Sequence, residues 1–300
     1  MGFSRSVKMD LHVHSTASDG TLTPAEILAR AACLGLGSLA ITDHDTVEGA
    51  RAAVASGVPA SIHFFTGIEI SAAPPPFLPR RGSFHILGYG IRLEDAGLNA
   101  ALMRLQQARQ ERNPAMVERL RRLGIDISME ELAAHAGNAQ IGRPHIAGLM
   151  IRKGVVASFD EAFDRYIGTG KAAYVDKYRI PCEEAIQLIH RAGGIAVMAH
   201  PGLLGPMPDA VFNALISGLK RMGIDGIEVY YPEHTREQTE RYRRTAGRFD
   251  LVITGGTDFH GDIKPGIDLG VGDGSFAVPH FVYEQLAGML GGSGCPAATA

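Results

Sequence analysis

Cysteine is scarce in this 300-residue sequence, and neither sign of charge is in large excess. Cys33, Cys182 and Cys295 lie far apart and form no C-x-x-C pair, which argues against a disulfide framework and against thiolate metal ligands. We therefore expect a cytosolic location. The formal net charge of −3 gives no global attraction to nucleic acid or to an anionic membrane, so an anionic substrate needs a local binding site.

Long apolar runs are missing as well. No run reaches the roughly 18 residues that a membrane span requires, and the N-terminus lacks the apolar segment of a signal peptide. Hydrophobic residues make up 45% of the chain, which is enough for a sizeable core. These properties favour a globular enzyme, built as one large α/β domain or two small ones, with no membrane partner.

A pair of histidines stands at the end of the first expected strand, residues 7–14. Side chains alternate across a strand, so Asp10, His12 and His14 share one face. Histidines at positions i and i+2 of a strand can bind one metal ion from the same side. The H-x-H pattern is a weak signal by itself, because polar residues often end strands.

Strands and helices alternate over most of the chain. Thr23 and Glu26 form a capping box with a proline between them, which predicts a helix from Pro24 onward. Further strands are expected over residues 38–42, 62–70, 84–91, 195–199, 226–230 and 251–254. Helices are expected over residues 46–56, 181–192, 210–222 and 237–248. This alternation predicts parallel β/α units, in which loops after the strands form the active-site rim.

Residues 94–178 depart from this pattern, because strand signals vanish and helix signals recur. Helices are expected over residues 99–112 and 114–123, and two capping boxes follow at Ser128/Glu131 and Ser158/Glu161. The Asn113-Pro114 step predicts a new helix cap or a kink. We interpret the region as a helical insertion.

Nine polar residues at strand ends are candidate metal ligands. Imidazole and carboxylate groups suit zinc, manganese or iron. Nine are too many for one ion, but they can serve two or three ions if one carboxylate bridges. Asp258 and His260 repeat the i, i+2 spacing on another strand. The candidates are His12, His14, Asp19, His44, Glu69, His85, His200, Asp258 and His260.

Such a cluster is suited to hydrolysis of a phosphoester. Metal ions lower the pKa of bound water towards ~7, and paired ions roughly 3.5–4 Å apart stabilise the attacking and leaving oxygens. Three divalent ions set against Asp19, Glu69 and Asp258 leave a formal charge of about +3, or about +2 with a bound hydroxide. A phosphomonoester dianion balances that charge, whereas a peptide or neutral sugar does not.

The motifs together resemble those of the PHP (polymerase and histidinol phosphatase) metal-dependent phosphoesterases. They occur in one order at compatible spacings and cover nearly the whole chain, which makes the resemblance specific. The motifs are Asp10-Leu11-His12-Val13-His14-Ser15, Ser18-Asp19-Gly20, Thr42-Asp43-His44-Asp45, Gly67-Ile68-Glu69, His85, His200-Pro201 and Thr257-Asp258-Phe259-His260. The resemblance implies an α/β fold, a distorted (β/α)7 barrel of residues 1–93 and 179–300, interrupted by residues 94–178 as a substrate cap.

The resemblance also implies which residues hold each ion. The first ion is assigned to His12, His14, Glu69 and Asp258, the second to Glu69 as a bridge with His85 and His200, and the third to Asp19, His44 and His260. All nine positions are occupied, so a degenerate module is not expected. The residues expected to be catalytic are Asp19, His44, Glu69 and Asp258.

The insertion and the motif at residues 256–261 resemble the small stand-alone branch that acts on nucleotides. These enzymes remove phosphate from 5′-AMP or 3′,5′-bisphosphonucleosides, or trim short RNA from its 5′ end, and their insertion supplies cations for phosphate. The candidates for substrate contact are Arg109, Arg112, Arg143, His145 and Lys171, although a solvated helix face is an equal alternative for them.

We therefore expect hydrolysis of a nucleotide phosphomonoester by a metal-bridging hydroxide, with two or three Mn, Fe or Zn ions as cofactors. A phosphodiesterase, acting on a cyclic diester or as a 5′→3′ exoribonuclease, is the alternative. A metal-loaded module without turnover is a third possibility. The expected partners are a nucleotide or short RNA, with no stable protein partner implied.

A few further residues have two interpretations each. Asp43 and Asp45 either orient imidazoles or cap a helix, and Asp45 is also a candidate proton donor to the leaving group. Tyr89, Tyr230 and Phe77 either stack on a base or, as we favour, pack in the core or in a loop.

Overall fold

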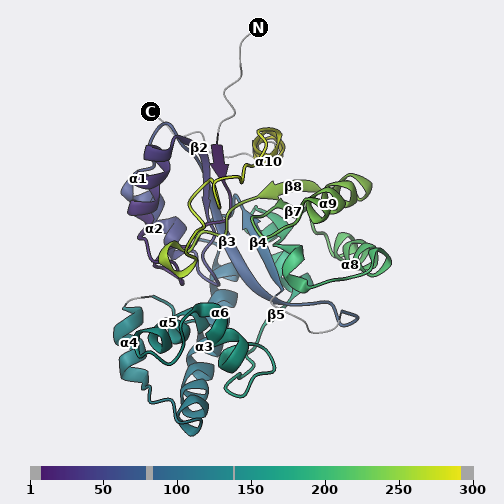
Figure 1. The fold of residues 1–300 in the computed structure, drawn as a ribbon. Coiled ribbons are helices and arrows are strands. Elements are labelled where there is room, and N and C mark those ends of the chain that lie inside the picture. Colours follow the sequence, from purple (N-terminus) through teal and green to yellow (C-terminus); the bar gives the residue numbers. More distant parts are fainter. Residues whose placement is uncertain (1–7, 79–83, 138, 292–300) are drawn as a thin grey trace.

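The computed structural model of the chain describes residues 8–78, 84–137 and 139–291. Its centre is a sheet that curls into a nearly closed barrel (Figure 1). Neighbouring strands follow the order β1 (Lys8–Asp10), β2 (Leu36–Ile41), β3 (His63–Ala73), β4 (His85–Tyr89), β6 (Ile195–Met198), β7 (Gly226–Tyr230) and β8 (Val252–Gly255), while β5 (Ile180–Pro181) pairs with β3. The predicted barrel is confirmed. Val7, where the first strand was expected to begin, lies outside the described residues.

One strand runs against the others. β4 is antiparallel to both β3 and β6, so the prediction of uniformly parallel units is wrong there. Parallel neighbours need a crossover connection, usually a helix, whereas antiparallel neighbours need only a short loop. The sequence predicts no helix between residues 70 and 84. The lack of a helix there was the signal that β4 could be antiparallel to β3.

Helices surround the sheet (Figure 1), and all of them except the last, α10, lie at the predicted places. The capping box of Thr23 and Glu26 is formed at the start of the first of them. They are α1 (Pro24–Leu34), α2 (Glu48–Ser56), α7 (Cys182–Arg191), α8 (Asp209–Arg221), α9 (Arg236–Arg248) and α10 (Phe281–Gly291). Within the described part of the chain, no helix is both long enough and apolar enough to cross a membrane.

The expected insertion is helical and gathers at one end of the sheet (Figure 1). Residues such as Met116, Leu120, Ile146 and Met150 form its own apolar core. The first half of its long helix packs into the barrel core instead, for example through Leu105. Its elements are α3 (Ala96–Arg122), α4 (Met129–Ala136), α5 (Arg143–Arg152), α6 (Phe159–Ala162) and a π-helical turn, Phe163–Ile167.

Helix α3 continues through Pro114, so the prediction that one helix ends there is wrong. A proline inside a helix removes one backbone hydrogen bond. Apolar side chains on both sides of it are fully buried, Leu105 in the barrel core and Leu120 in the insertion core. We attribute the continuous helix to this packing. It keeps Arg109 and Arg112 on one helix.

Candidate metal and phosphate site

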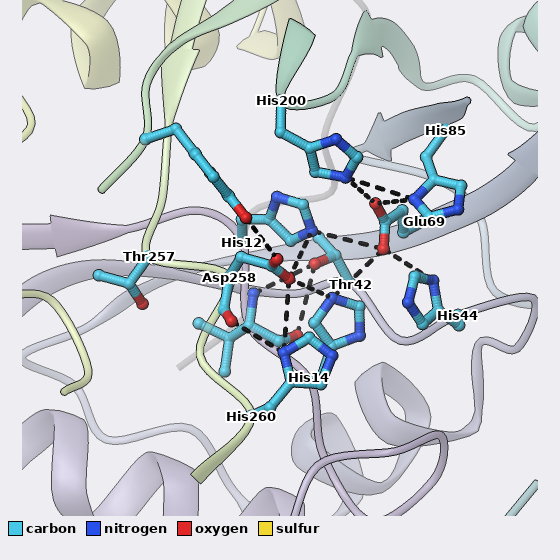
Figure 2. A network of polar contacts seen from close by, with 12 residues as sticks. His12, His14, Thr42, His44, Glu69, His85, His200, Thr257, Asp258 and His260 are labelled. Carbon is cyan, nitrogen blue, oxygen red and sulfur yellow. Dashed lines mark hydrogen bonds and ion pairs between the residues drawn. The ribbon is translucent and has the colours of Figure 1, made fainter. Parts of the chain in front are cut away.

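All nine candidate ligands converge at one end of the barrel, and Figure 2 shows them except for Asp19. The chain segments after β1 and β8 run side by side, since the His14 N–H donates to the Phe259 carbonyl at 2.9 Å. The segment after β2 lies beside β3 in the same way, because the Asp45 N–H donates to the Glu69 carbonyl at 2.9 Å. Distant motifs of the sequence therefore meet in one pocket.

One group of ligand atoms matches the set expected for the first ion. His12 Nε2 lies 3.5 Å from Glu69 Oε2 and 3.4 Å from Asp258 Oδ1. His14 Nε2 lies 3.3 Å and 3.1 Å from the same two oxygens. Four converging donors with two carboxylates form a geometry that suits a divalent cation.

The other two groups overlap the first. Glu69 Oε1 lies 2.8 Å from His85 Nδ1 and 2.9 Å from His200 Nε2, so the two oxygens of Glu69 face different sets of imidazoles. His44 also joins this group, with Nδ1 2.7 Å from Glu69 Oε2. The third group contains His14 in addition to the expected Asp19, His44 and His260.

The pocket leaves its inward-facing atoms without hydrogen-bond partners. His44 Nδ1, although close to Glu69, is not aligned for a hydrogen bond. Unpartnered buried polar atoms cost stability, so their clustering calls for a ligand. Nitrogen and oxygen donors without thiolate suit a divalent metal ion, and the clusters therefore indicate divalent metal binding. The unpartnered atoms are His12 Nε2, His14 Nε2, Asp19 Oδ1, His44 Nδ1 and Glu69 Oε2.

The carboxylates and imidazoles of the pocket shift one another's pKa values. Burial alone would lower the pKa of His14, but Asp258 and Glu69 raise it to about 10. Burial opposes ionisation of Glu69, yet His44 and His85 hold the pKa of this carboxyl well below its usual range. A metal ion that binds here must displace a proton from imidazole, so binding releases protons.

Several residues outside the nine fix the ligands from behind. Glu228, fully buried on β7, places Oε1 3.0 Å from His12 Nδ1 and accepts a hydrogen bond from the His200 N–H at 2.7 Å. A carboxylate behind a metal-binding imidazole orients the ring and raises its basicity. The sequence analysis missed Glu228. The signal was a lone carboxylate in the otherwise uncharged strand Gly226–Tyr230.

Asp258 is held through its outer oxygen. Lys264 Nζ lies 2.7 Å from Oδ2, and the Tyr231 hydroxyl donates to the same atom at 3.0 Å. Oδ1 is thereby directed towards His12 and His14. Lys264 and Tyr231 were also missed from sequence, because no motif links them to Asp258.

Asp43 and Asp45, for which the sequence left several roles open, have different hydrogen-bond partners. Asp43 accepts hydrogen bonds from Ser15 and from the Ser18 hydroxyl, whose oxygen lies 3.5 Å from His14 Nδ1, so it orients the loop around His14. Asp45 accepts two hydrogen bonds from Arg109, at 3.0 and 2.6 Å. Burial opposes its ionisation, but Arg109 and Lys177 keep the pKa of Asp45 below its usual range. Asp45 therefore anchors Arg109 at the cavity.

Backbone strain is concentrated at this site. Among the described non-glycine residues, positive φ occurs at Asp45, His200, Asp250 and Asp258, with values of 55°, 23°, 49° and 53°. Such conformations cost about 1–3 kcal/mol each and persist where the surroundings enforce them. Two of the four are ligand candidates and a third holds Arg109.

A cationic wall faces the ligand cluster across a cavity of about 240 Å³. Arg109, Arg112 and Arg143 of the insertion line it, together with Lys177 and Arg179 from the segment before β5. Arg143 lies between two rings, with its guanidinium 5.2 Å from the centre of Phe163 and 5.8 Å from that of Tyr174.

Two cations of this wall lack hydrogen-bond partners, namely Arg112 at Nη2 and Lys177 at Nζ. Burial, with Arg109 and Arg143 close by, lowers the pKa of Arg112 to about 9. Burial also lowers the pKa of Lys177 to about 7, although Asp45 lies 3.6 Å from its ammonium. Crowded, unpartnered donors of one sign form a binding site for an anion.

Two of the five candidates for substrate contact lie elsewhere. His145 is buried at the start of α5, where its Nδ1 accepts a hydrogen bond from the Gly142 N–H at 3.0 Å. Lys171 is exposed and is not part of the cavity wall. Lys177 and Arg179 take that place, and sequence reasoning did not single them out. Tyr89, considered for base stacking, is buried and donates its hydroxyl proton to the Leu11 carbonyl.

Comparison with known proteins agrees with this geometry. The PHP domain family matches residues 10–253. A 5′-3′ exoribonuclease of Haemophilus influenzae is 36% identical over 253 residues, which cover 84% of this chain and 90% of that protein. A 3′,5′-nucleoside bisphosphate phosphatase of Chromobacterium violaceum is 34% identical over 263 residues, covering 87% and 90%.

A solved structure shares the fold. It is that of a Chromobacterium violaceum protein described as an amidohydrolase, with bound sulfate and no metal. It superposes with a TM-score of 0.82 at 32% sequence identity and covers 94% of this chain and 97% of that one. The chain therefore belongs to the PHP domain family of metal-dependent phosphoesterases.

Proposed function

We propose that this chain hydrolyses phosphomonoesters of nucleotides, of the 5′-AMP or 3′,5′-bisphosphonucleoside type. One observation carries the proposal. Unpartnered, buried ligand atoms such as Glu69 Oε2 and unpartnered, buried cationic donors, Arg112 Nη2 and Lys177 Nζ, line opposite sides of one cavity. A substrate with two phosphate groups, or with one phosphate and a ribose, satisfies both sides together.

The roles of the residues follow from their places. We assign His12, His14, Glu69 and Asp258 to one ion, Glu69, His85 and His200 to a second, and Asp19, His44 and His260 to a third. Divalent ions held there would supply Lewis-acid chemistry, lowering the pKa of water and neutralising phosphoryl oxygens. Arg112, Arg143 and Lys177 would bind the non-reacting phosphate or ribose and so orient the ester bond. Asp45 positions Arg109 for the same purpose.

We further propose that residues 94–178 are the substrate cap on a barrel of residues 1–93 and 179–300. The separate apolar core of the insertion and its three arginines at the cavity support this division. Helix α3 serves both parts, since its first half packs against the barrel.

A diester substrate is the second candidate, because the Haemophilus influenzae relative is named a 5′-3′ exoribonuclease. The cationic wall is also compatible with a diesterase. The arginines would bind the terminal phosphate of an RNA, and the next phosphate would lie at the ligand cluster. The two functions differ in product, since the first releases inorganic phosphate and the second releases mononucleotides.

Product analysis tests the proposal. The protein is loaded separately with Mn, Zn or Fe, its metal content is measured, and it is offered adenosine 3′,5′-bisphosphate, 5′-AMP, a cyclic nucleotide, 5′-phosphorylated short RNA and histidinol phosphate. We expect two or three ions per chain and inorganic phosphate from a nucleotide. Stepwise mononucleotide release from RNA alone would favour the diesterase. Fully loaded protein without turnover on any of these substrates would leave only a binding module.

A further inference from the structure

A second cavity adjoins the catalytic one across the segment Tyr174–Arg179. It measures about 290 Å³ and shares Tyr174, Lys177 and Arg179 with the catalytic cavity. Its remaining wall comes from the end of β3, from Phe84, and from Thr169 and Tyr178 of the chain after the π-helical turn. The two cavities therefore meet at the cationic wall.

The two cavities have different linings. The catalytic cavity is lined mainly by imidazole, carboxylate and cationic groups. The second cavity has an apolar part, formed by Phe84, which is buried, Tyr178, which is 45% exposed, Ala72, Ala73 and Pro74. Its charged groups, Asp176, Lys177 and Arg179, lie in the segment shared with or next to the catalytic cavity. Flat apolar walls with a few polar atoms, here Thr169 among them, suit a heteroaromatic ring.

The wall between the cavities is fixed in place. The Tyr174 hydroxyl donates to Asp176 Oδ1 at 2.9 Å and accepts from Arg179 Nη2 at 3.2 Å. Arg179 also pairs with Asp176, and Arg119 binds the Tyr174 carbonyl. Lys177 and Arg179 thus stand at a preformed boundary, where they can hold a phosphate while the group attached to it enters the second cavity.

We propose that the second cavity is a nucleobase subsite, with Tyr178 as its stacking residue. The inference rests on the proposed function, since it names where the substrate's base lies. Aromatic rings bind bases of any sequence through their faces, so the subsite would contribute affinity for nucleotides with little choice among bases. The base belongs either to the nucleotide being hydrolysed or to the next nucleotide of a short RNA, and the chemistry is the same.

The decisive experiment removes the base from the substrate. KM is measured for adenosine 3′,5′-bisphosphate and for the same sugar bisphosphate with hydrogen in place of adenine. A second pair is the 5′-phosphorylated adenylyl dinucleotide and its analogue without the second base. We expect a KM about tenfold lower with the base in one pair. The pair that shows this gap identifies which base occupies the cavity.

Substitutions test whether Tyr178 causes this difference in KM between substrates with and without the base. Tyr178→Ala should abolish it, whereas Tyr178→Phe, which keeps the ring, should retain it. Phe281→Ala is the matched control, because this ring is also exposed but lies on α10, outside both cavities. Melting temperatures check that each variant is folded. The inference is overturned if the wild type shows no gap in either pair, or if Tyr178→Ala keeps it.

Failure of the proposed function gives a different result. If no nucleotide is hydrolysed, the same pairs are compared by equilibrium binding to the protein. A base-dependent affinity that Tyr178→Ala removes would support the subsite and discard only the reaction. Equal binding of base-bearing and base-free compounds, with hydrolysis of both, would discard only the subsite.

Discussion

The two sides of the catalytic cavity handle concentrated charge in different ways. On the barrel side, several ligand candidates are held from behind, as Glu228 holds His12 and Lys264 holds Asp258, and inward atoms such as His14 Nε2 and Glu69 Oε2 are left without hydrogen-bond partners. On the insertion side, the cations lie close together; Arg109 pairs with Asp45 and Arg179 with Asp176, while Arg112 Nη2 and Lys177 Nζ have no hydrogen-bond partner. The first arrangement suits resident cations, and the second suits an anion that arrives and leaves.

Loss of Glu69, the carboxylate that we propose is shared by two ions, should have the largest effect on metal content and activity. The two oxygens of Glu69 face different sets of imidazoles, Oε2 facing His14 and Oε1 facing His200. Glu69→Gln should therefore weaken metal binding in the whole ligand cluster. We expect metal content to fall and kcat to drop by more than about a hundredfold, because even partners behind the ligands are worth about 10–100-fold. Elemental analysis and phosphate release measure the two effects. Full metal content in this variant would contradict the assignment.

Glu228 tests whether the support behind the ligands matters. Glu228→Gln keeps the size of the side chain but removes the charge beside His12 and the His200 N–H. Metal affinity should weaken by about 10–100-fold while the fold is retained. Titration of the metal-free protein with Mn or Zn measures the change. Glu237→Gln on the exposed face of α9 is the control, and equal affinities in the two variants would show that Glu228 has only a structural role.

Substitution of Arg112 tests the insertion side of the cavity separately from the ligand cluster. Its Nε donates to Asn113 Oδ1, but its Nη2 has no partner and is available to substrate, so Arg112→Gln should raise KM for a bisphosphonucleotide about tenfold or more. Metal content should stay at the wild-type level. Arg121→Gln, an exposed position further along α3, is the matched control. A loss of bound metal in the Arg112 variant would mean that the two sides are not independent.

The two sides also differ in how far the sequence predicts them. The ligands could be found because their motifs follow expected strands, although β1 ends at Asp10 and β8 at Gly255, before the pairs His12/His14 and Asp258/His260. The segments after these two strands are then joined by a bridge between Val13 and Phe259. Periodicity and capping signals predicted the alternating strands and helices and the helical region of residues 94–178, whereas the barrel was implied by the resemblance of the motifs. The antiparallel β4 required attention to the missing helix before it.

The cationic wall and the supporting residues depend on contacts between distant elements. Lys171 and Lys177 are six positions apart and look alike in sequence, yet only Lys177 reaches the cavity, because the segment before β5 docks against β3. Glu228 stands behind His12, which is 216 positions away in the chain, and Lys264 reaches Asp258 through a loop without a recognisable motif. No local pattern reports such packing, so these residues became visible only in the folded chain.

The pH dependence of substrate binding should give the smallest and most selective effect. Burial, with Arg109, Arg112 and Arg179 nearby, lowers the pKa of Lys177 from its ordinary 10.5 to about 7, against the opposing charge of Asp45. Lys177 is therefore protonated below that pH and loses its charge as pH rises through it. KM for the bisphosphonucleotide should rise with pH above about 7 in the wild type, and Lys177→Met should remove that dependence while raising KM at lower pH. Since Lys177 touches none of the nine ligand candidates, metal content should stay constant over the same range in both proteins. A KM profile that is identical in the two proteins would show that the ammonium of Lys177 does not contact the substrate, and the anion site would then rest on the arginines alone.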